Sequence, residues 1–334
     1  MCLQVGVQLA ERDAGAAAKL PVLFIHDAAI DDFIATMLLV AMPNVDLKGI
    51  VIADADCIPG PGMDAASRLQ QFIGRPDIPL ALSESRGWNP FPWPYRGDCV
   101  SFGALPMLAR FCPKVSTPPP SGNALITALL EQARASGDKL TILLTTGFTP
   151  LTDVLRVRPE LTSAIAQVVW MGGAINVAGN LDPSTVNPAV ANPHAEWNVF
   201  WDPFAAQDGL EMFAGIHDFP LDITNQVPIS KSFMATLQAQ AVKYSFSQLA
   251  YDAYQLVAAE PFYDMWDVCA AVFLARPDLY APAQPLKLYV VQWGYEQGWL
   301  RQVNDAKNMQ NVYLGFRDLN GFYNYVTSQL ARSA

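Results

Sequence analysis

Three aspartates, Asp27, Asp31 and Asp32, lie within six positions of each other in the stretch "FIHDAAIDDFIATMLLV", residues 24–40. An aspartate suits a helix N-terminus, but one cap needs only one oxygen acceptor. Three neighbouring carboxylates repel each other unless a cation or a proton neutralises them. The chain contains only three histidines, and carboxylate oxygens select a hard cation such as Ca²⁺ or Mg²⁺. This stretch therefore predicts a carboxylate-held metal rather than a zinc site.

Other carboxylates also stand where a predicted strand ends or a predicted helix begins. Asp54 and Asp56 follow the second predicted strand in "ADADC", and Asp267 opens an apolar helical pattern in "WDVCAA". Ligands of open parallel sheets bind beyond the carboxyl ends of the strands. We therefore expect these acids to converge at one edge of a sheet.

The elements that must position these residues follow from apolar patterns that alternate along the chain. Strands are predicted at 20–25, 47–53, 78–83, 139–146, 166–173 and 217–224, and an antiparallel hairpin at 286–303. Helices are predicted at 31–42, 62–73, 123–136, 151–157, 203–213, 231–259, 262–275 and 319–330. This order predicts the α/β class: one large domain with a mostly parallel central sheet, a Rossmann-like open sheet flanked by helices, and a small antiparallel hairpin near the C-terminus.

Three Pro- and Gly-rich stretches, 83–99, 111–123 and 175–198, are predicted as long loops, which in compact domains usually carry function. Residues 1–18 are interpreted as an N-terminal extension without a secretory pattern, and 19–334 as the domain.

Composition excludes several classes of function. Half of the 334 residues are hydrophobic, 16% are charged and the net charge is −10, so a large core is available. No Lys/Arg cluster occurs, which argues against nucleic acid and anionic membranes as partners. No run of 18 apolar residues predicts a transmembrane helix. The five cysteines are scattered and odd in number, so we expect reduced thiols in a cytoplasmic protein.

Five motifs, in order, resemble the nucleoside hydrolase family. "IHDAAIDD" (25–32) is similar to its D-x-D-x-x-x-D-D motif, with Ile25 in place of the first Asp. The acidic turn "DADC" (54–57), "VVWMGGAINVAGN" (168–180), "HAEWNVFWDP" (194–203) and "WDVCAA" (266–271) resemble its later segments. The resemblance runs from about residue 20 to the last helix and implies cleavage of an N-glycosidic bond of a ribonucleoside.

The resemblance also implies roles for individual residues. Asp27, Asp32 and Asp267 would bind one Ca²⁺ together with a backbone carbonyl near Thr146, and Asp27 would act as the general base on water. The ribose hydroxyls would be held by Asp31, Asn180, Glu196, Asn198 and Asp267. Homodimers or homotetramers are usual in such a family.

The base side resembles the purine-preferring branch, because Trp266 stands where many members carry a histidine. Asp56 would contact the base, and Tyr95 or Trp93 of "NPFPWPYR" (89–96) would stack on it. Aromatic side chains in such a loop also serve simply to anchor it.

Alternative functions remain open at this point. The chain would be a Ca²⁺-dependent purine ribonucleoside hydrolase, a hydrolase of a modified or 5′-substituted riboside, or an inactive nucleoside- or sugar-binding relative. Ile25, Ala28 and Ala29 depart from the family pattern, and residues 181–193 form a long insert. Mg²⁺-dependent phosphoryl transfer is disfavoured, since no Gly-rich phosphate loop occurs.

Overall fold

The structure is a computed structural model that describes residues 18–334 except 92–94, 185, 190 and 261–262. The predicted extension over 1–18 therefore lies almost wholly outside the described residues, as does the predicted stacking residue Trp93.

In the described residues, nine strands form one sheet with the order β3-β2-β1-β4-β5-β6-β9-β7-β8. Their bounds are β1 Leu20–His26, β2 Val45–Ile52, β3 Leu80–Leu82, β4 Leu140–Leu144, β5 Ile165–Trp170, β6 His217–Asp218, β7 Gln284–Val290, β8 Leu300–Gln302 and β9 Met309–Val312. Strands β1 to β6 pair in parallel and β9 extends them parallel to β6, whereas β7 is antiparallel to both β8 and β9. The predicted α/β architecture with a C-terminal antiparallel hairpin is confirmed.

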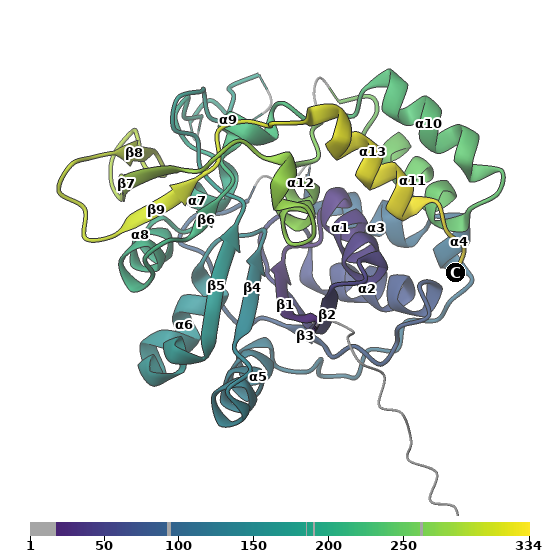
Figure 1. Ribbon diagram of the computed structural model, residues 1–334, viewed down its shortest axis with the longest axis horizontal. Helices are drawn as coiled ribbons and strands as arrows, with labels where there is room; N and C mark the ends of the chain where they lie inside the picture. The colour runs from purple at the N-terminus through teal and green to yellow at the C-terminus, as the bar shows by residue number, and fades with distance from the viewer. Residues whose placement is uncertain (1–17, 92–94, 185, 190, 261–262) are drawn as a thin grey trace, which may run out of the picture.

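Helices cover both faces of this sheet (Figure 1). The α-helices are α1 Ile30–Ala41, α2 Pro59–Phe72, α3 Asp98–Gly103, α4 Pro106–Ala109, α5 Gly122–Ser136, α6 Thr149–Val157, α7 Trp197–Trp201, α8 Pro203–Met212, α9 Leu221–Thr224, α10 Lys231–Ala241, α11 Ser245–Leu256, α12 Trp266–Phe273 and α13 Leu319–Leu330. Short 3₁₀ turns are η1 Tyr95–Gly97, η2 Pro159–Ala164 and η3 Pro277–Leu279.

The central strand β1 shows why the sheet is buried on both faces. Its side chains alternate, so Val22 and Phe24 join a core with α1, α2, α11, α12 and α13. Leu23 and Ile25 join a second core with α5, α6 and α8 on the other face. A strand buried on both faces is a continuous apolar run, as in "LPVLFI". The carboxyl end of this strand leads directly into the three aspartates.

Several predicted elements differ from the structure. The strand expected over 217–224 stops at Asp218, because Pro220 cannot extend a ladder and precedes α9. The helix expected over 231–259 is two helices, α10 and α11, and the next helix begins at Trp266 rather than at 262. Strand β9 was not predicted. The predicted loops over 83–99 and 175–198 end in helical segments, α3 and α7.

Within the part of the chain that the structure describes, no helix is both long and apolar enough to cross a membrane.

Candidate active site

A cavity lies at the carboxyl ends of the central parallel strands and collects most of the predicted site residues. Its lining contains nine of them: Asp27, Asp31, Asp56, Tyr95, Asn180, Glu196, Asn198, Trp266 and Asp267. Asp32 and Thr146 are fully buried behind the lining. The structure therefore brings together residues spread over some 240 positions of the sequence, as expected for the edge of a parallel sheet.

Three carboxyl groups converge at the cavity, one from the end of β1 and one from each of the helices α1 and α12. Asp27 follows β1, Asp32 lies in the first turn of α1 and Asp267 in that of α12, and all three are buried. Burial and the negative charge of Asp32 raise the pKa of Asp27 well above its usual value. Burial and the charges of Asp31 and Asp32 do the same for Asp267. Crowded carboxyls of this kind are suited to a hard cation, which would neutralise them.

No group of three or more His, Cys, Asp or Glu side chains is already arranged as a coordination sphere among the described residues. Asp32 is instead held in place from several sides. It accepts hydrogen bonds from the Ala29 N–H at 3.0 Å and the Thr145 hydroxyl at 2.6 Å. Asp32 therefore has a fixed position beside Asp27 and Asp267.

The turn after β4 places uncharged polar groups beside the three carboxyls. Thr145 lines the cavity, whereas the Thr146 carbonyl accepts a 3.2 Å hydrogen bond from the Trp170 indole N–H. Gly147 follows, and a Cβ there would stand 2.5 Å from the Trp201 ring. Only glycine lets this turn pack so closely against α7.

Backbone strain occurs within the acidic stretch itself. Ala28 has a φ of 67°, in the left-handed region that disfavours residues with a Cβ, and its N–H donates to Nδ1 of His26 at 3.1 Å. The family resemblance places Ala28 where glycine or proline is usual. In this chain the left-handed conformation is adopted by an alanine.

One side of the cavity is built on α7 and on the loop between β5 and α7. Glu196 caps α7 by accepting from the Asn198 N–H at 2.9 Å, and it also accepts from the Gly173 N–H at 2.8 Å. Gly173 has a φ of 86°, and a Cβ there would meet Leu300 at 2.4 Å. Burial raises the pKa of Glu196 to about 7 although these N–H groups oppose the shift.

Two amides complete this side. The Asn198 side chain donates to the Met171 carbonyl at 3.0 Å, and the Asn180 side chain accepts from the Trp197 N–H at 3.1 Å. Each amide therefore has a fixed orientation in the cavity wall, which suits recognition of sugar hydroxyls.

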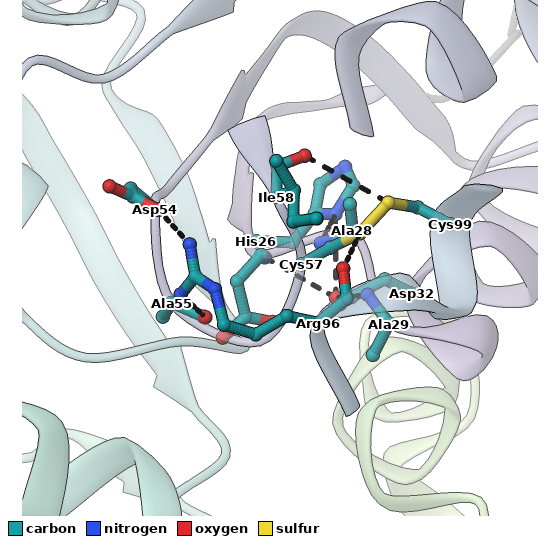
Figure 2. Close-up of a disulfide and its surroundings, with 11 residues drawn as sticks. His26, Ala28, Ala29, Asp32, Asp54, Ala55, Cys57, Ile58, Arg96 and Cys99 are labelled. Carbon is teal, nitrogen blue, oxygen red and sulfur yellow. Dashed lines mark hydrogen bonds and ion pairs between the residues drawn. A yellow bond between two sulfur atoms is a disulfide. The ribbon is translucent and has the colours of Figure 1, made fainter. Parts of the chain in front are cut away.

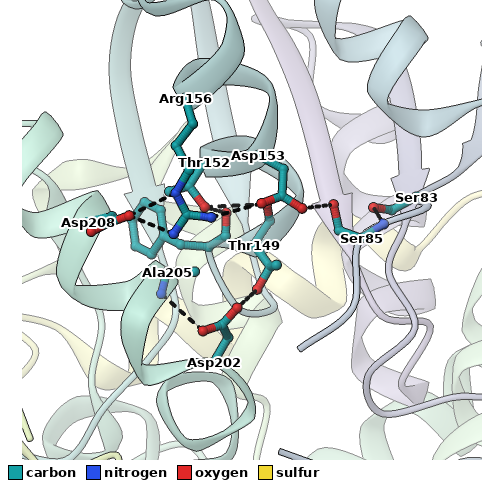
Figure 3. Close-up of polar contacts among 10 residues, drawn as sticks. Ser83, Ser85, Thr149, Thr152, Asp153, Arg156, Asp202, Ala205 and Asp208 are labelled. Carbon is teal, nitrogen blue, oxygen red and sulfur yellow. Dashed lines mark hydrogen bonds and ion pairs between the residues drawn. The ribbon is translucent and has the colours of Figure 1, made fainter. Parts of the chain in front are cut away.

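A polar cluster outside the cavity joins the loops that carry these residues (Figure 3). The Asp202 carboxylate caps α8 through the Ala205 N–H and accepts from the Thr149 hydroxyl at 2.9 Å. Asp153 of α6 accepts from the Ser85 hydroxyl at 2.7 Å. The helices α6 and α8 and the loop after β3 are thereby held together.

The other side of the cavity is aromatic. Tyr95 lines it together with Phe91, Trp197, Tyr263 and Trp266. Trp197 lines the cavity and also contacts the Phe91 ring, with 4.7 Å between the ring centroids. The Tyr263 and Trp266 rings meet edge to face at 4.7 Å. These rings provide flat apolar surfaces for a planar group.

A disulfide joins the turn after β2 to helix α3 on this side (Figure 2). Cys57 and Cys99 are bonded with a Cα–Cα distance of 6.2 Å, so the prediction that the cysteines are reduced thiols is wrong for this pair. Sequence spacing did not reveal the pair because its partners are 42 positions apart on different elements. Cys112 and Cys269 are free.

An arginine strengthens the same junction. The Arg96 guanidinium donates to the Ala55 carbonyl at 2.7 Å and to the Asp54 carboxylate at 2.5 Å. The Ile58 N–H donates to the Arg96 carbonyl at 3.1 Å. These bonds set the position of Tyr95 in η1 relative to Asp56.

Sequence reasoning missed several lining residues. Asp98, Glu260, Tyr263, Met171 and Thr145 line the cavity but were not assigned to the site. Tyr263 stands three positions before the helix that begins at Trp266, and Asp98 three positions after Tyr95. That proximity was the only available signal, and it does not reveal which way a side chain points.

Known proteins resemble this chain over most of its length. The profile of the family described as inosine-uridine preferring nucleoside hydrolase matches residues 22–320. The pyrimidine-specific ribonucleoside hydrolase RihA of Citrobacter koseri is 27% identical over 293 residues, which cover 84% of this chain and 86% of that protein. RihA of Salmonella typhi is 25% identical over the same length.

Solved structures share the fold. The inosine-uridine preferring nucleoside hydrolase from Bacillus anthracis has a TM-score of 0.83 and 30% identity, covering 93% of this chain and 99% of that one. The purine-preferring ribonucleoside hydrolase from Gardnerella vaginalis has a TM-score of 0.74 at 19% identity, covering 93% and 98%, and at that identity it supports the fold alone.

Proposed function

The chain belongs to the inosine-uridine preferring nucleoside hydrolase family, and from this premise we propose that it is a Ca²⁺-dependent hydrolase with a preference for purine ribonucleosides. Hydrolysis of the N-ribosyl bond of nucleosides is the activity of the family. The metal, the preferred base and the residue roles are the proposal. The convergence of Asp27, Asp32 and Asp267 beneath a cavity lined by amides and aromatic rings carries it.

Asp27, Asp32 and Asp267 would hold the cation, with a backbone carbonyl of the turn at Thr145 and Thr146. The oxygen-only donor set suits Ca²⁺. When bound, the ion would neutralise the crowded carboxyls and lower the pKa of water beside it.

The protein's own groups then perform the reaction. Asp27 takes a proton from the attacking water as that water adds to C1′ of the ribose. The C1′–N bond breaks through a state with positive charge on the sugar, which nearby carboxylates stabilise. Asp31, Asn180, Glu196 and Asn198 orient the ribose through its hydroxyls.

The purine preference rests on the aromatic side. Trp266 and Tyr95 line the cavity on different elements, so a base can lie between flat surfaces. Stacking contributes roughly 1–3 kcal/mol per base. Asp56, in the lining beside them, would contact the base. The pyrimidine-specific relatives named above make uridine and cytidine the necessary comparison substrates.

A homodimer or homotetramer and a cytoplasmic location also stay predictions. The Cys57–Cys99 disulfide counts against a strongly reducing compartment.

The deciding experiment is reducing-sugar release from a panel of ribonucleosides, modified ones included, with calcium or with a chelator. Release from inosine and guanosine above that from uridine and cytidine, lost on chelation, would support the proposal. Faster release from pyrimidines would contradict the preference, and full activity in chelator would contradict the metal. Failure of every ribonucleoside in a folded, calcium-loaded protein would favour the alternatives, a specialised riboside or a binding protein.

A further inference from the structure

The base end of the cavity is more acidic than recognition of a neutral nucleobase requires. Of the seven carboxyl residues in the lining, Asp27 and Asp267 are assigned to the metal, and Asp31 and Glu196 to the ribose. Asp56 is assigned to the base, and Asp98 and Glu260 remain without a role in the reaction described so far. The aromatic rings of Tyr95, Phe91 and Trp266 line the same cavity.

These three carboxyls are close enough to act on each other. The Asp98 charge contributes to raising the pKa of Asp56 and of Glu260. Burial is the larger cause for both of them, and burial raises the pKa of Asp98 to about 6. Burial raises the pKa of Tyr263 well above its usual value, and the charges of Asp31, Asp56 and Asp98 raise it further. The charge on each of Asp56, Asp98 and Glu260 therefore depends on the charge of its neighbours in the cavity.

A covalent bond joins the two residues that follow Asp56 and Asp98 in the chain. Each aspartate directly precedes one cysteine of the Cys57–Cys99 disulfide, whose Cα atoms are 6.2 Å apart (Figure 2). The chain therefore fixes two carboxyl-bearing positions side by side despite their mutual repulsion. A positive charge placed between them would remove that repulsion.

The surrounding protein does not supply this charge. Across the described residues, the cavity lining contains no lysine, arginine or histidine, and neither Asp98 nor Glu260 forms an ion pair. Arg96, two positions before Asp98, is already bonded to Asp54 and to the Ala55 carbonyl.

Resting on the function proposed above, we propose that the cavity takes ribonucleosides whose base carries a positive charge, such as an N-methylated purine, and that Asp98 and Glu260 select for that charge. Carboxylates attract the charge directly, and the faces of aromatic rings attract a cation through their quadrupole. A neutral base would supply no counter-charge to these partly buried carboxyls.

A positive charge on the base also makes the base a better leaving group when the C1′–N bond breaks. When the C1′–N bond of a cationic riboside breaks, its electron pair passes to the base nitrogen and cancels the positive charge. The base leaves as a neutral molecule and needs no proton from the protein. Water adds at C1′ and loses its proton to Asp27, so atoms and charges balance. A lining without a cationic acid is sufficient for this reaction.

The test compares proteins on one substrate at a time, because a methylated base is by itself the better leaving group. The substrates are 7-methylguanosine and guanosine, and the proteins are the wild type, the double variant Asp98→Asn/Glu260→Gln and the control Asp77→Asn. Asp77 is an exposed carboxyl paired with Arg75 on the surface, so the control removes a charge away from the cavity.

We expect kcat/KM on 7-methylguanosine to fall roughly 10- to 100-fold in the double variant, mainly through KM, since each tenfold corresponds to about 1.4 kcal/mol. Guanosine should change less than about threefold, and the control should match the wild type on both. Equal losses on the two substrates, or none, would overturn the selection while leaving the proposed hydrolase intact.

A binding measurement decides the question independently of turnover. The cation 1-methylnicotinamide and neutral nicotinamide differ by one methyl group and one charge. We expect only the cation to raise the thermal midpoint of the wild type, and this shift to vanish in the double variant. A shift of equal size with both compounds, or with neither, would refute the inference even if no ribonucleoside were cleaved.

Discussion

The backbone N–H of Asp267 donates a 2.9 Å hydrogen bond to the Asp31 carboxylate, across 236 positions of sequence. The other Asp31 oxygen accepts from the Tyr263 hydroxyl at 3.2 Å. Asp31 therefore aligns α12 against α1, and with it the Asp267 carboxyl that faces Asp27. Burial and the charge of Asp32 raise the pKa of Asp31 to about 7. One residue thus contributes both to the predicted sugar contact and to the geometry of the metal site.

Replacing the proposed general base should separate function from stability. We expect Asp27→Asn to lower kcat/KM by roughly 10²- to 10⁴-fold, which is the contribution of proton transfer to a positioned base. In chelator, the variant should be as stable as the wild type or more so, since one of three crowded carboxyls is neutralised. Thermal unfolding with and without calcium, beside ribose release, measures both. Near-normal turnover would disprove the assignment.

Stability without calcium should depend on the ionisation of Glu196. Its pKa is about 7 when folded and near the ordinary 4.5 when unfolded, so the folded state binds more protons between these values. The contribution of Glu196 to the free energy of unfolding is therefore fully present below pH 4.5. It is lost as the pH rises to about 7, and the loss amounts to roughly 3 kcal/mol. Urea unfolding at pH 5 and pH 8 in chelator measures the loss.

The matched variant for that experiment is Glu196→Gln, which keeps an acceptor but does not titrate. Other buried acids, Asp31 among them, titrate in the same range, so the difference between the two proteins isolates Glu196. If the free energy of unfolding changes with pH equally in the wild type and the variant, Glu196 does not contribute to the pH dependence of stability.

The disulfide should contribute to both stability and substrate binding. Its loop of 42 residues corresponds to roughly 4 kcal/mol in the chain-entropy description. We expect Cys57→Ser/Cys99→Ser to lower the unfolding free energy by that order and to raise KM, because Asp56, Tyr95 and Asp98 flank the bond. The control is Cys112→Ser, at an exposed free cysteine. Unchanged denaturation and KM in the double variant would exclude this role.

Trp266 should matter most when the base is a poor leaving group. We expect Trp266→Ala to lower kcat/KM on inosine by about 5- to 150-fold, the range that corresponds to 1–3 kcal/mol of stacking. An activated nitrophenyl riboside should be affected less, because its leaving group needs no assistance. Trp88→Ala, at a ring 59% exposed and outside the cavity lining, is the control. Equal losses on the two substrates would count against stacking as the source of activation.

The sequence by itself determined the α/β class, the strand-end acids and the sugar-side motif. These features depend on residues close together in the chain: the apolar run before Asp27, the helix that Glu196 caps and the helix that opens with Trp266. Local periodicity and local capping suffice to predict such elements.

Only the tertiary structure decided which residues meet at the base end. Strand β9, the Cys57–Cys99 bond and the grouping of Asp98 and Glu260 with Asp56 all join segments far apart in sequence. Thr145, not Thr146, lines the cavity because the buried turn after β4 fixes which side chain and carbonyl face inwards. Contacts of this kind arise when packing of the two cores brings distant loops to one sheet edge, and no short stretch of sequence encodes them.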